Sequence, residues 1–206
     1  MGIIERREQE KEEMREIILN AATKIINSEG YEKLSMRKIA NEIDYSATTI
    51  YSYYKDKAQI IDDILNKIYI EIVINVVDAL NQNEDLSIEG QFELISKVFI
   101  NTMVKKEEMG KAVIRSGSNR MFEPTGDVEE FEMSGVAMLQ SLIDEGQEQS
   151  IFRETDDNIS WMIITALLGF CMNAIENKMY LNEDWDKLVD DYVKLLSYGL
   201  VKKGEV

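Results

Sequence analysis

The sequence predicts an all-α fold. An N-terminal three-helix domain with a helix-turn-helix should span residues 1–56, and a larger helical domain should span residues 57–206. Three observations support this fold class. The chain of 206 residues contains one proline and 11 glycines, so few positions interrupt a helix. Apolar residues recur at helical spacing along most of the chain, and residues typical of helix caps separate three closely spaced patterns before residue 60.

The first helix should be long and end at Gly30, a residue suited to the position after a helix. Residues 1–16 are rich in charge and predict a solvated helical arm, with a contact of Arg6, Arg7 or Lys11 to nucleic acid as the alternative. An apolar stripe follows, formed by Ile17, Ile18, Ala21, Ala22, Ile25 and Ile26. This stripe predicts the face that packs on the next two helices.

Two short helices joined by a tight turn should follow. Ser35 is placed to cap the first of them, Asp44 interrupts the pattern, and Ser46 is placed to cap the second. Asp56 and Gln59 have the spacing of a capping box for the next helix. The second short helix consists mostly of small, hydroxylated and aromatic residues. A polar second helix after a tight turn is the geometry that enters the major groove of DNA.

These residues resemble the DNA-binding domain of TetR-family transcriptional regulators. The family signature around the recognition helix is matched by Ser46, Thr48, Thr49, Ile50, Tyr51, Tyr53, Tyr54 and Lys57. The match covers about the first third of the chain. There are two departures: Asp44 stands where the family commonly has glycine in the turn, and Thr48 replaces a glycine common in the recognition helix. Asp visits the left-handed conformation more readily than most residues, so the turn can still form.

The resemblance implies a homodimeric regulator of transcription that binds a palindromic double-stranded DNA operator. It further implies a repressor released by a small-molecule effector, with dimerisation through the last two long helices. A helical ligand-binding or scaffold dimer without DNA binding is the alternative function.

The DNA-binding candidates combine cations with polar or small residues near the turn. Tyr51 and Lys57 match family positions that contact phosphates, and their phenol and ammonium groups suit that role. Base-edge or methyl contact is expected from Tyr45, Ala47, Thr48 and Thr49. The full set is Arg37, Lys38, Tyr45, Ser46, Ala47, Thr48, Thr49, Tyr51, Lys55 and Lys57.

Charge is divided unevenly along the chain. Residues 1–60 carry ten basic and eleven acidic residues, whereas residues 61–206 carry 13 basic and 28 acidic ones. The acidity therefore belongs to the second domain, and a locally basic surface near the turn can still engage phosphates.

Residues 57–206 should form a bundle of amphipathic helices. Apolar rows run from Ile60 to Leu80, and a helix from Lys57 to about Leu80 would link the two domains. Further helices are expected from residue 88 to 103, then as a shorter piece to about 121, and again over 131–143, 159–175 and 185–196. Residues 159–175 contain no charged side chain, which allows either a membrane span or a buried helix. Their polar residues and acidic flanks favour a buried helix covered partly by a second copy of the chain, so no membrane contact is expected.

The second domain should hold the effector cavity that the resemblance implies. The candidate lining residues are Phe99, Met103, Phe122, Met138, Trp161, Met162 and Phe170. Eleven methionines and the surplus of carboxylates favour an apolar or cationic effector over an anionic one.

Composition argues against several other functions. The chain has no histidine, so it lacks the commonest general base and metal ligand. We found no nucleophile paired with a base, no phosphate-binding glycine loop and no metal-ligand cluster. We therefore expect no enzyme activity, no catalytic residues, no cofactor and no metal. A single cysteine, Cys171, and the absence of a secretory signal favour a reducing cytoplasm.

Overall fold

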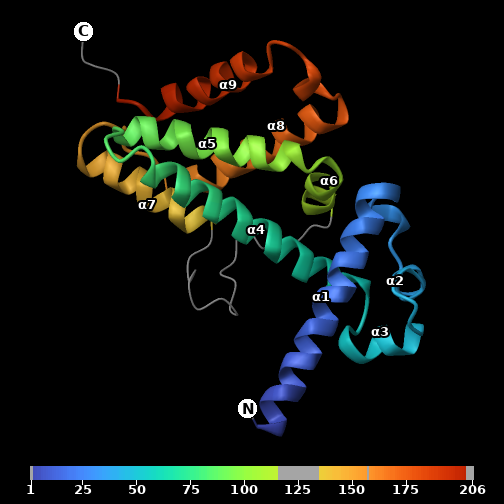
Figure 1. The fold of residues 1–206 in the computed structure, drawn as a ribbon. Helices are drawn as coiled ribbons and strands as arrows, with labels where there is room; N and C mark the ends of the chain where they lie inside the picture. The colour runs from blue at the N-terminus through green and yellow to red at the C-terminus, as the bar shows by residue number, and fades with distance from the viewer. Residues whose placement is uncertain (1, 116–134, 157, 203–206) are drawn as a thin grey trace.

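The structure is a computed structural model, and it describes residues 2–115, 135–156 and 158–202 (Figure 1). Within these ranges the chain is helical apart from turns and one isolated pair of bridged residues, Phe152 and Val201, so the predicted all-α class is confirmed. The α-helices are α1 (Ile3–Glu29), α2 (Met36–Glu42), α3 (Ala47–Tyr53), α4 (Lys57–Asn81), α5 (Ile88–Lys105), α6 (Glu107–Arg115), α7 (Gly135–Glu148), α8 (Ile159–Glu176) and α9 (Trp185–Leu200).

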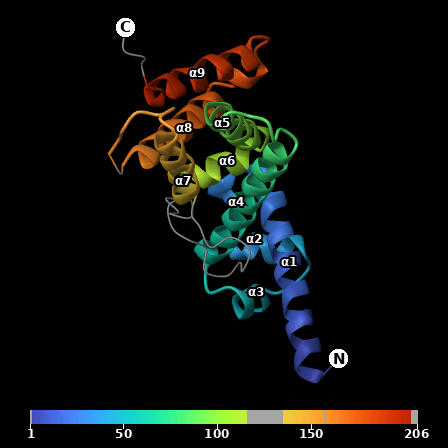
Figure 2. The ribbon, with the colours of Figure 1, turned by 90° about the vertical axis from the view of Figure 1, so that its left-hand side faces the viewer.

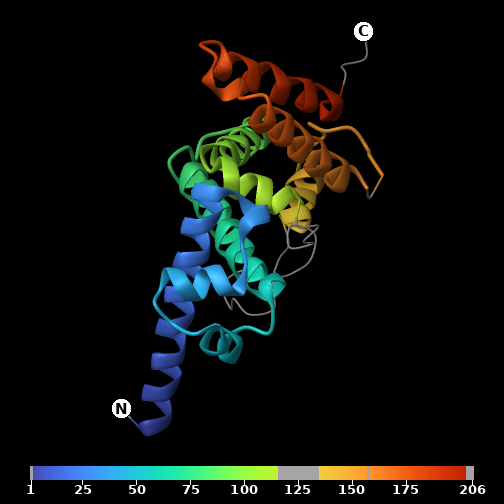
Figure 3. The same cartoon turned by 90° about the vertical axis from the view of Figure 1, so that its right-hand side faces the viewer.

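Helices α1, α2 and α3 form a compact head at one end of the molecule, as Figure 3 shows. Helix α1 is followed by Gly30, whose φ of 88° is a backbone conformation that residues other than glycine rarely adopt. A 3-10 helix, η1 (Tyr31–Lys33), then leads into α2, which Ser35 caps by accepting from the Lys38 N–H at 3.2 Å. Asp44 takes the left-handed conformation expected for the turn, with φ of 57°.

The core of the head is made from the apolar faces of all three helices. Ile18, Ala22 and Ile26 of α1 are buried against Ile39 of α2 and Ile50 of α3. Burial of one such aliphatic side chain contributes roughly 1.5–3 kcal/mol. The stripe read from the sequence is therefore the core of the head, except that Ile17 lies at the surface.

Helix α4 connects the head to the body. Its N-cap Asp56 accepts from the Gln59 N–H at 3.0 Å, while the Gln59 side chain accepts from the Lys55 N–H, one residue earlier than a standard capping box. One apolar row, from Ile60 to Val76, is buried along almost the whole helix. The helix packs on α1 at one end and on α5 further along (Figure 1). The domain boundary after residue 56 falls at its start and stays a prediction.

The body is a bundle of α4 to α9, with α8 and α9 at the end far from α3 (Figure 2). Helix α5 packs against α4, α8 and α9, and α7 packs against α8. Helix α6 touches α1 and η1, so it makes a second connection between body and head. At this junction the Lys111 ammonium bonds to both Glu107 at 2.8 Å and Glu108 at 2.7 Å. Hydrogen bonds from Lys111 and then Tyr180 hold the pKa of the Glu107 carboxyl below its usual value.

Helix α8 is only partly covered by its own chain. Ile163, Ile164, Leu167 and Cys171 are buried on one face. By length and composition alone, α8 is the one helix of the described ranges that could cross a membrane, with a mean hydropathy of 1.6. The sequence predicted a buried helix covered partly by a second copy of the chain. Within one copy the opposite face of α8 is open, and its cover by a second copy stays a prediction.

Candidate nucleic-acid interface and effector cavity

Helix α3 is short, and its neighbours fix its position. Ser46 caps its start, accepting from the Thr49 N–H at 3.1 Å. Ile50 is fully buried in the head, and Tyr54, just past the last turn, is 1% exposed. Two turns of helix are marginal in isolation, so the cap and these two anchors are what hold α3 in place.

One face of α3 and the turn before it is open to solvent. Tyr45, Thr48, Tyr51 and Ser52 share this face, because they are spaced by three or four residues and all four are exposed. Tyr45 is 45% exposed and Tyr51 is 56% exposed, although both are large aromatic residues. The sequence analysis missed Ser52, which its position four residues after Thr48 would have revealed.

Three other residues of the predicted contact set are turned inward or engaged within the helix. Ser46 and Thr49 share a hydrogen bond between their hydroxyl groups at 2.9 Å. Ala47 is half-buried and packs against the core of the head. Their contribution to a DNA contact would come from the backbone at the start of α3, where N–H groups face outward.

Of the four predicted basic contact residues near this face, two are exposed and two already interact with other side chains. Arg37 and Lys55 are exposed. Lys57 lies over the ring of Tyr31, with its ammonium 5.0 Å from the ring centroid. Lys38 is paired with Glu29 across the α1–α2 contact, so it must leave that carboxylate to reach a phosphate.

A charged cluster that the sequence analysis did not anticipate holds the far end of α3. Arg15 of α1 donates to the Tyr53 carbonyl at 3.4 Å, and its guanidinium lies 4.9 Å from the centroid of the Tyr54 ring. The Tyr54 hydroxyl donates to Asp63 of α4 at 2.9 Å. Burial, and then this hydrogen bond, raise the pKa of Tyr54 above its usual value. The cluster therefore holds α1 and α4 against the C-terminal end of α3. We call α3 (Ala47–Tyr53) the reading helix.

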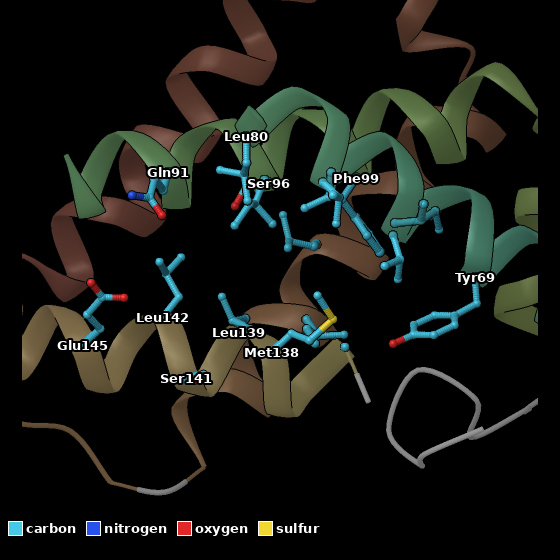
Figure 4. A pocket seen from close by; sticks show the side chains of 18 residues that line it. Tyr69, Leu80, Gln91, Ser96, Phe99, Met138, Leu139, Ser141, Leu142 and Glu145 are labelled. Atoms are coloured by element: carbon cyan, nitrogen blue, oxygen red, sulfur yellow. The ribbon is translucent and has the colours of Figure 1, made fainter. Parts of the chain in front are cut away.

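The body contains a cavity of about 260 Å³ between α4, α5, α7 and α8 (Figure 4). Its apolar lining consists of Ile72, Val73, Val76, Val77, Leu80, Ile95, Phe99, Met138, Leu139, Leu142, Ile164 and Leu167. The polar lining side chains are Tyr69, Gln91, Ser96, Ser141 and Glu145. None of the described residues that line it is Lys or Arg. A largely apolar cavity with a few polar groups is typical of a small-molecule site.

The cavity has two different ends. Gln91 of α5 and Glu145 of α7 lie together at one end, and Tyr69 of α4 lies at the other (Figure 4). Burial raises the pKa of the Tyr69 hydroxyl, so this group is neutral at pH 7 and acts as a hydrogen-bonding group.

Only part of the predicted effector set reaches this cavity. Phe99 and Met138 line it, whereas Met103 is 1% exposed and does not belong to the lining. Phe170 stacks between the rings of Trp185 and Tyr192, with centroids at 5.9 Å and 4.1 Å, and serves the α8–α9 contact. Phe122 lies outside the described residues. Most of the lining is aliphatic, which is why a search for Met and aromatic residues did not find it.

Two more members of that predicted set lie on the open face of the body. Trp161 and Met162 of α8 are 52% and 58% exposed, and neither lines the cavity. On α9, Leu195 and Tyr198 are exposed to an even greater extent, at 66% and 68%. Exposed large apolar side chains on neighbouring helices are typical of an interaction surface. We call these four residues the α8–α9 face.

The capped reading helix, its open polar and aromatic face and the three-helix core define a helix-turn-helix protein of the DNA-binding type. Residues 18–64 match the family described as bacterial regulatory proteins, tetR family. The N-terminal part of the chain is therefore similar to the DNA-binding domain of this family of bacterial transcriptional regulators.

Two curated relatives are similar to the N-terminal part of the chain. An uncharacterized HTH-type transcriptional regulator of Haemophilus influenzae is 33% identical over 61 residues, covering 30% of this chain and 33% of the relative. The HTH-type transcriptional regulator HbdR of Aromatoleum sp. is 38% identical over 79 residues, covering 38% of this chain and 31% of the relative. The chain thus matches about a third of the length of these relatives.

Solved structures are similar over nearly the whole chain. A protein of unknown function from Rhodococcus sp. RHA1 has a TM-score of 0.69 at 16% identity, covering 91% of this chain and 95% of that one. A putative TetR-family regulator from Vibrio parahaemolyticus has a TM-score of 0.63 at 22% identity, covering 92% and 99%. The fatty acid degradation regulator FadR of Bacillus halodurans has a TM-score of 0.63 at 21% identity, covering 90% and 98%. These similarities establish a shared fold.

Proposed function

We propose that this protein is a transcriptional repressor that binds a palindromic operator as a homodimer and leaves it when a small molecule fills the body cavity. The observation that carries the proposal is the course of α4. This helix begins at Lys57, directly after the reading helix, and its later turns line the cavity from Tyr69 to Leu80. A ligand that displaces α4 in the body therefore acts on the head through the same helix.

Contacts to the operator are assigned to the open face of α3 and the cations around it. Tyr51 and Lys57 bind phosphates, and the exposed Tyr45 and Thr48 are the leading candidates for contact with base edges. Ala47 and Thr49 contribute through the backbone at the start of α3. Arg37 and Lys55 are exposed and add phosphate contacts on either side of α3.

Dimerisation is assigned to the α8–α9 face. A Cβ atom added at Gly169 of α8 or Gly199 of α9 would meet nothing within 4 Å, so both helices present open surface there. Two copies joined through this face would form an isologous interface of four helices. The symmetric dimer presents two reading helices to two half-sites about one helical turn apart, which accounts for a palindromic operator. Such a protein works where the chromosome is, in the cytoplasm.

Selection of bound fragments from a random DNA pool tests the proposal. The purified protein should enrich a palindrome at near-physiological salt, and Tyr51→Ala should weaken binding to that palindrome and to other sequences alike. Lys24→Ala is a matched control, because Lys24 is an exposed cation of the head that pairs with Glu42 away from α3. A dimer that enriches no sequence, and carries no ligand by native mass spectrometry, would refute DNA binding and favour the scaffold alternative.

Release is tested separately. With an operator in hand, a cavity-filling variant such as Ser96→Phe should resist release by any compound that releases the natural protein. Ser96 lines the cavity and is 1% exposed, so the larger ring would occupy ligand space. If compounds release both proteins equally, the cavity is not the effector site.

A further inference from the structure

The hydrogen-bond acceptors of Gln91 and Glu145, at one end of the cavity, indicate which kind of ligand group can bind there. The Gln91 amide donates its Nε2 to the Leu86 carbonyl at 3.2 Å, which fixes the amide orientation because Oε1 facing that carbonyl would be repelled. Glu145 Oε1 accepts from Gln149 at 3.0 Å. Within the described ranges, no donor reaches Gln91 Oε1 or Glu145 Oε2. Two acceptors, one of them charged, are therefore available to a donor on the ligand. Glu145 is exposed and Gln91 is half-buried, so this end of the cavity is in contact with solvent.

The helix ends near Gln91 and Glu145 also favour a positive charge on the ligand. Helix α4 ends at Asn81 and α7 ends at Glu148, so the negative ends of two helix dipoles lie toward this end of the cavity. Among the described helices that line the cavity, α5 starts at this end. There Ser87 already accepts from the Gly90 N–H, and Glu89 stands in the first turn. The local field is negative, in keeping with the acidic composition of the body.

An anionic ligand head would meet no partner here. None of the described lining residues is basic, and Glu145 would repel a carboxylate or phosphate placed beside it. Removing such a group from water without a compensating charge is costly. A protonated amine would instead gain charge-assisted hydrogen bonds to Glu145 and Gln91.

The cavity also limits the body of the ligand. Because an apolar cavity of about 150 Å³ holds one benzene, a cavity of about 260 Å³ suits a ligand of roughly ten to fifteen non-hydrogen atoms. The walls beyond the polar end are aliphatic, with Phe99 and Met138 deeper inside (Figure 4). This lining accepts an aromatic or branched apolar tail.

We propose that the cavity takes a compact primary amine with an apolar tail, its ammonium group bound between Glu145 and Gln91 and its tail directed toward Phe99. This inference rests on the proposed function, because it names the chemical class of the effector for the same site. It makes Glu145 the residue that selects ligands by charge.

Three probes with one tail and different heads test the inference: phenylbutylamine, phenylbutanol and phenylbutyrate, titrated into the full-length dimer by calorimetry at pH 7. The amine should bind about tenfold more tightly than the alcohol, since a hydrogen bond to a charged group is stronger than one between neutral groups and solvent at this end of the cavity reduces the difference. The acid should bind most weakly. Glu145→Gln should bring the amine to the affinity of the alcohol, and Glu145→Lys should favour the acid.

Glu148→Gln is the matched control, because Glu148 is exposed on the same helix and does not line the cavity. The amine should bind this variant as it binds the natural protein. If the acid binds best, or if Glu145→Gln leaves the order of the probes unchanged, the charge assignment is overturned while the effector cavity stands. If none of the probes binds, the proposed ligand class is wrong. If Ser96→Phe binds them all normally, the cavity is not the ligand site and release through the cavity fails with it, whereas operator binding is tested separately.

Discussion

Adding one methyl group at Gly146 should destabilise the body, because this glycine lies against an aromatic ring that has no room to retreat. A Cβ atom built there would lie 2.2 Å from Cδ2 and 2.7 Å from Cε2 of Phe152. The ring is 2% exposed and packs edge-on against Phe92 with centroids 6.4 Å apart. The Phe152 backbone is also fixed, since its N–H donates to the Gly146 carbonyl at 2.9 Å.

The expected cost of Gly146→Ala follows from these distances. Overpacking of a filled core costs about 1–3 kcal/mol, and contacts this short belong at the upper end of that range. Alanine gains back about 0.5–1 kcal/mol in a helix, which leaves a net loss of about 2 kcal/mol. For a protein of this size, that loss lowers the melting temperature by about 4–8 °C in a thermal melt followed by circular dichroism.

A double-mutant cycle with Phe152→Leu identifies the cause. Leucine removes part of the ring, so Gly146→Ala should cost much less in that background and the two changes should not add. A melting temperature for Gly146→Ala equal to or above that of the natural protein would refute the packing argument. Additive losses would show that the methyl group meets something other than the ring.

Three further outcomes are expected. Lys57→Ala should lower the salt dependence of DNA binding by about 0.9 per head, measured by filter binding against salt, because one phosphate contact is lost; Lys24→Ala should leave that slope unchanged. Leu195→Glu should weaken the dimer at least a hundredfold in sedimentation, since burial of the leucine is lost in both copies and a charge is buried in its place, and an unaltered dimer would exclude the α8–α9 face. Burial raises the pKa of the Cys171 thiol to about 12. Between about pH 9 and pH 12 the thiol ionises in the unfolded chain but stays protonated in the folded one, so the free energy of unfolding should fall as pH rises through this range. Iodoacetamide should therefore label Cys171 at pH 8 only after unfolding, and equal labelling of the native protein would contradict the burial.

Local signals in the sequence predicted the head well. Ser35, Ser46 and Asp56 each accept the cap hydrogen bond expected of them, because capping depends on residues only two or three positions apart. Asp44 adopts the left-handed turn for a similarly local reason. The roles assigned to the residues on α3 remain predictions, since no DNA is bound.

Features that depend on packing between distant segments were harder to predict. Arg15 donates to the carbonyl of Tyr53, 38 positions further along the chain. The charge-rich pattern of residues 1–16 predicted a solvated arm and not this contact. Composition suggested that Trp161 and Met162 would line a cavity, yet the rotation of α8 turns both outward. That rotation is set by the helices that cover the other side of α8. A single amphipathic pattern does not specify which neighbours those are.

Helix α4 contains neither glycine nor proline between Lys57 and Asn81, and its apolar row is buried along almost its whole length. A helix of this kind tilts as a rod and does not bend at a hinge. With a rise of 1.5 Å per residue, its N-terminus lies about 18 Å from Tyr69, so a tilt of about 6° at the cavity moves that end by about 2 Å. In a symmetric dimer the displacement is doubled to about 4 Å, slightly more than the rise of about 3.4 Å between neighbouring base pairs. The length of this unbroken helix would thus amplify a small change in cavity width. The amplified movement would displace the two α3 helices from the major grooves of the operator.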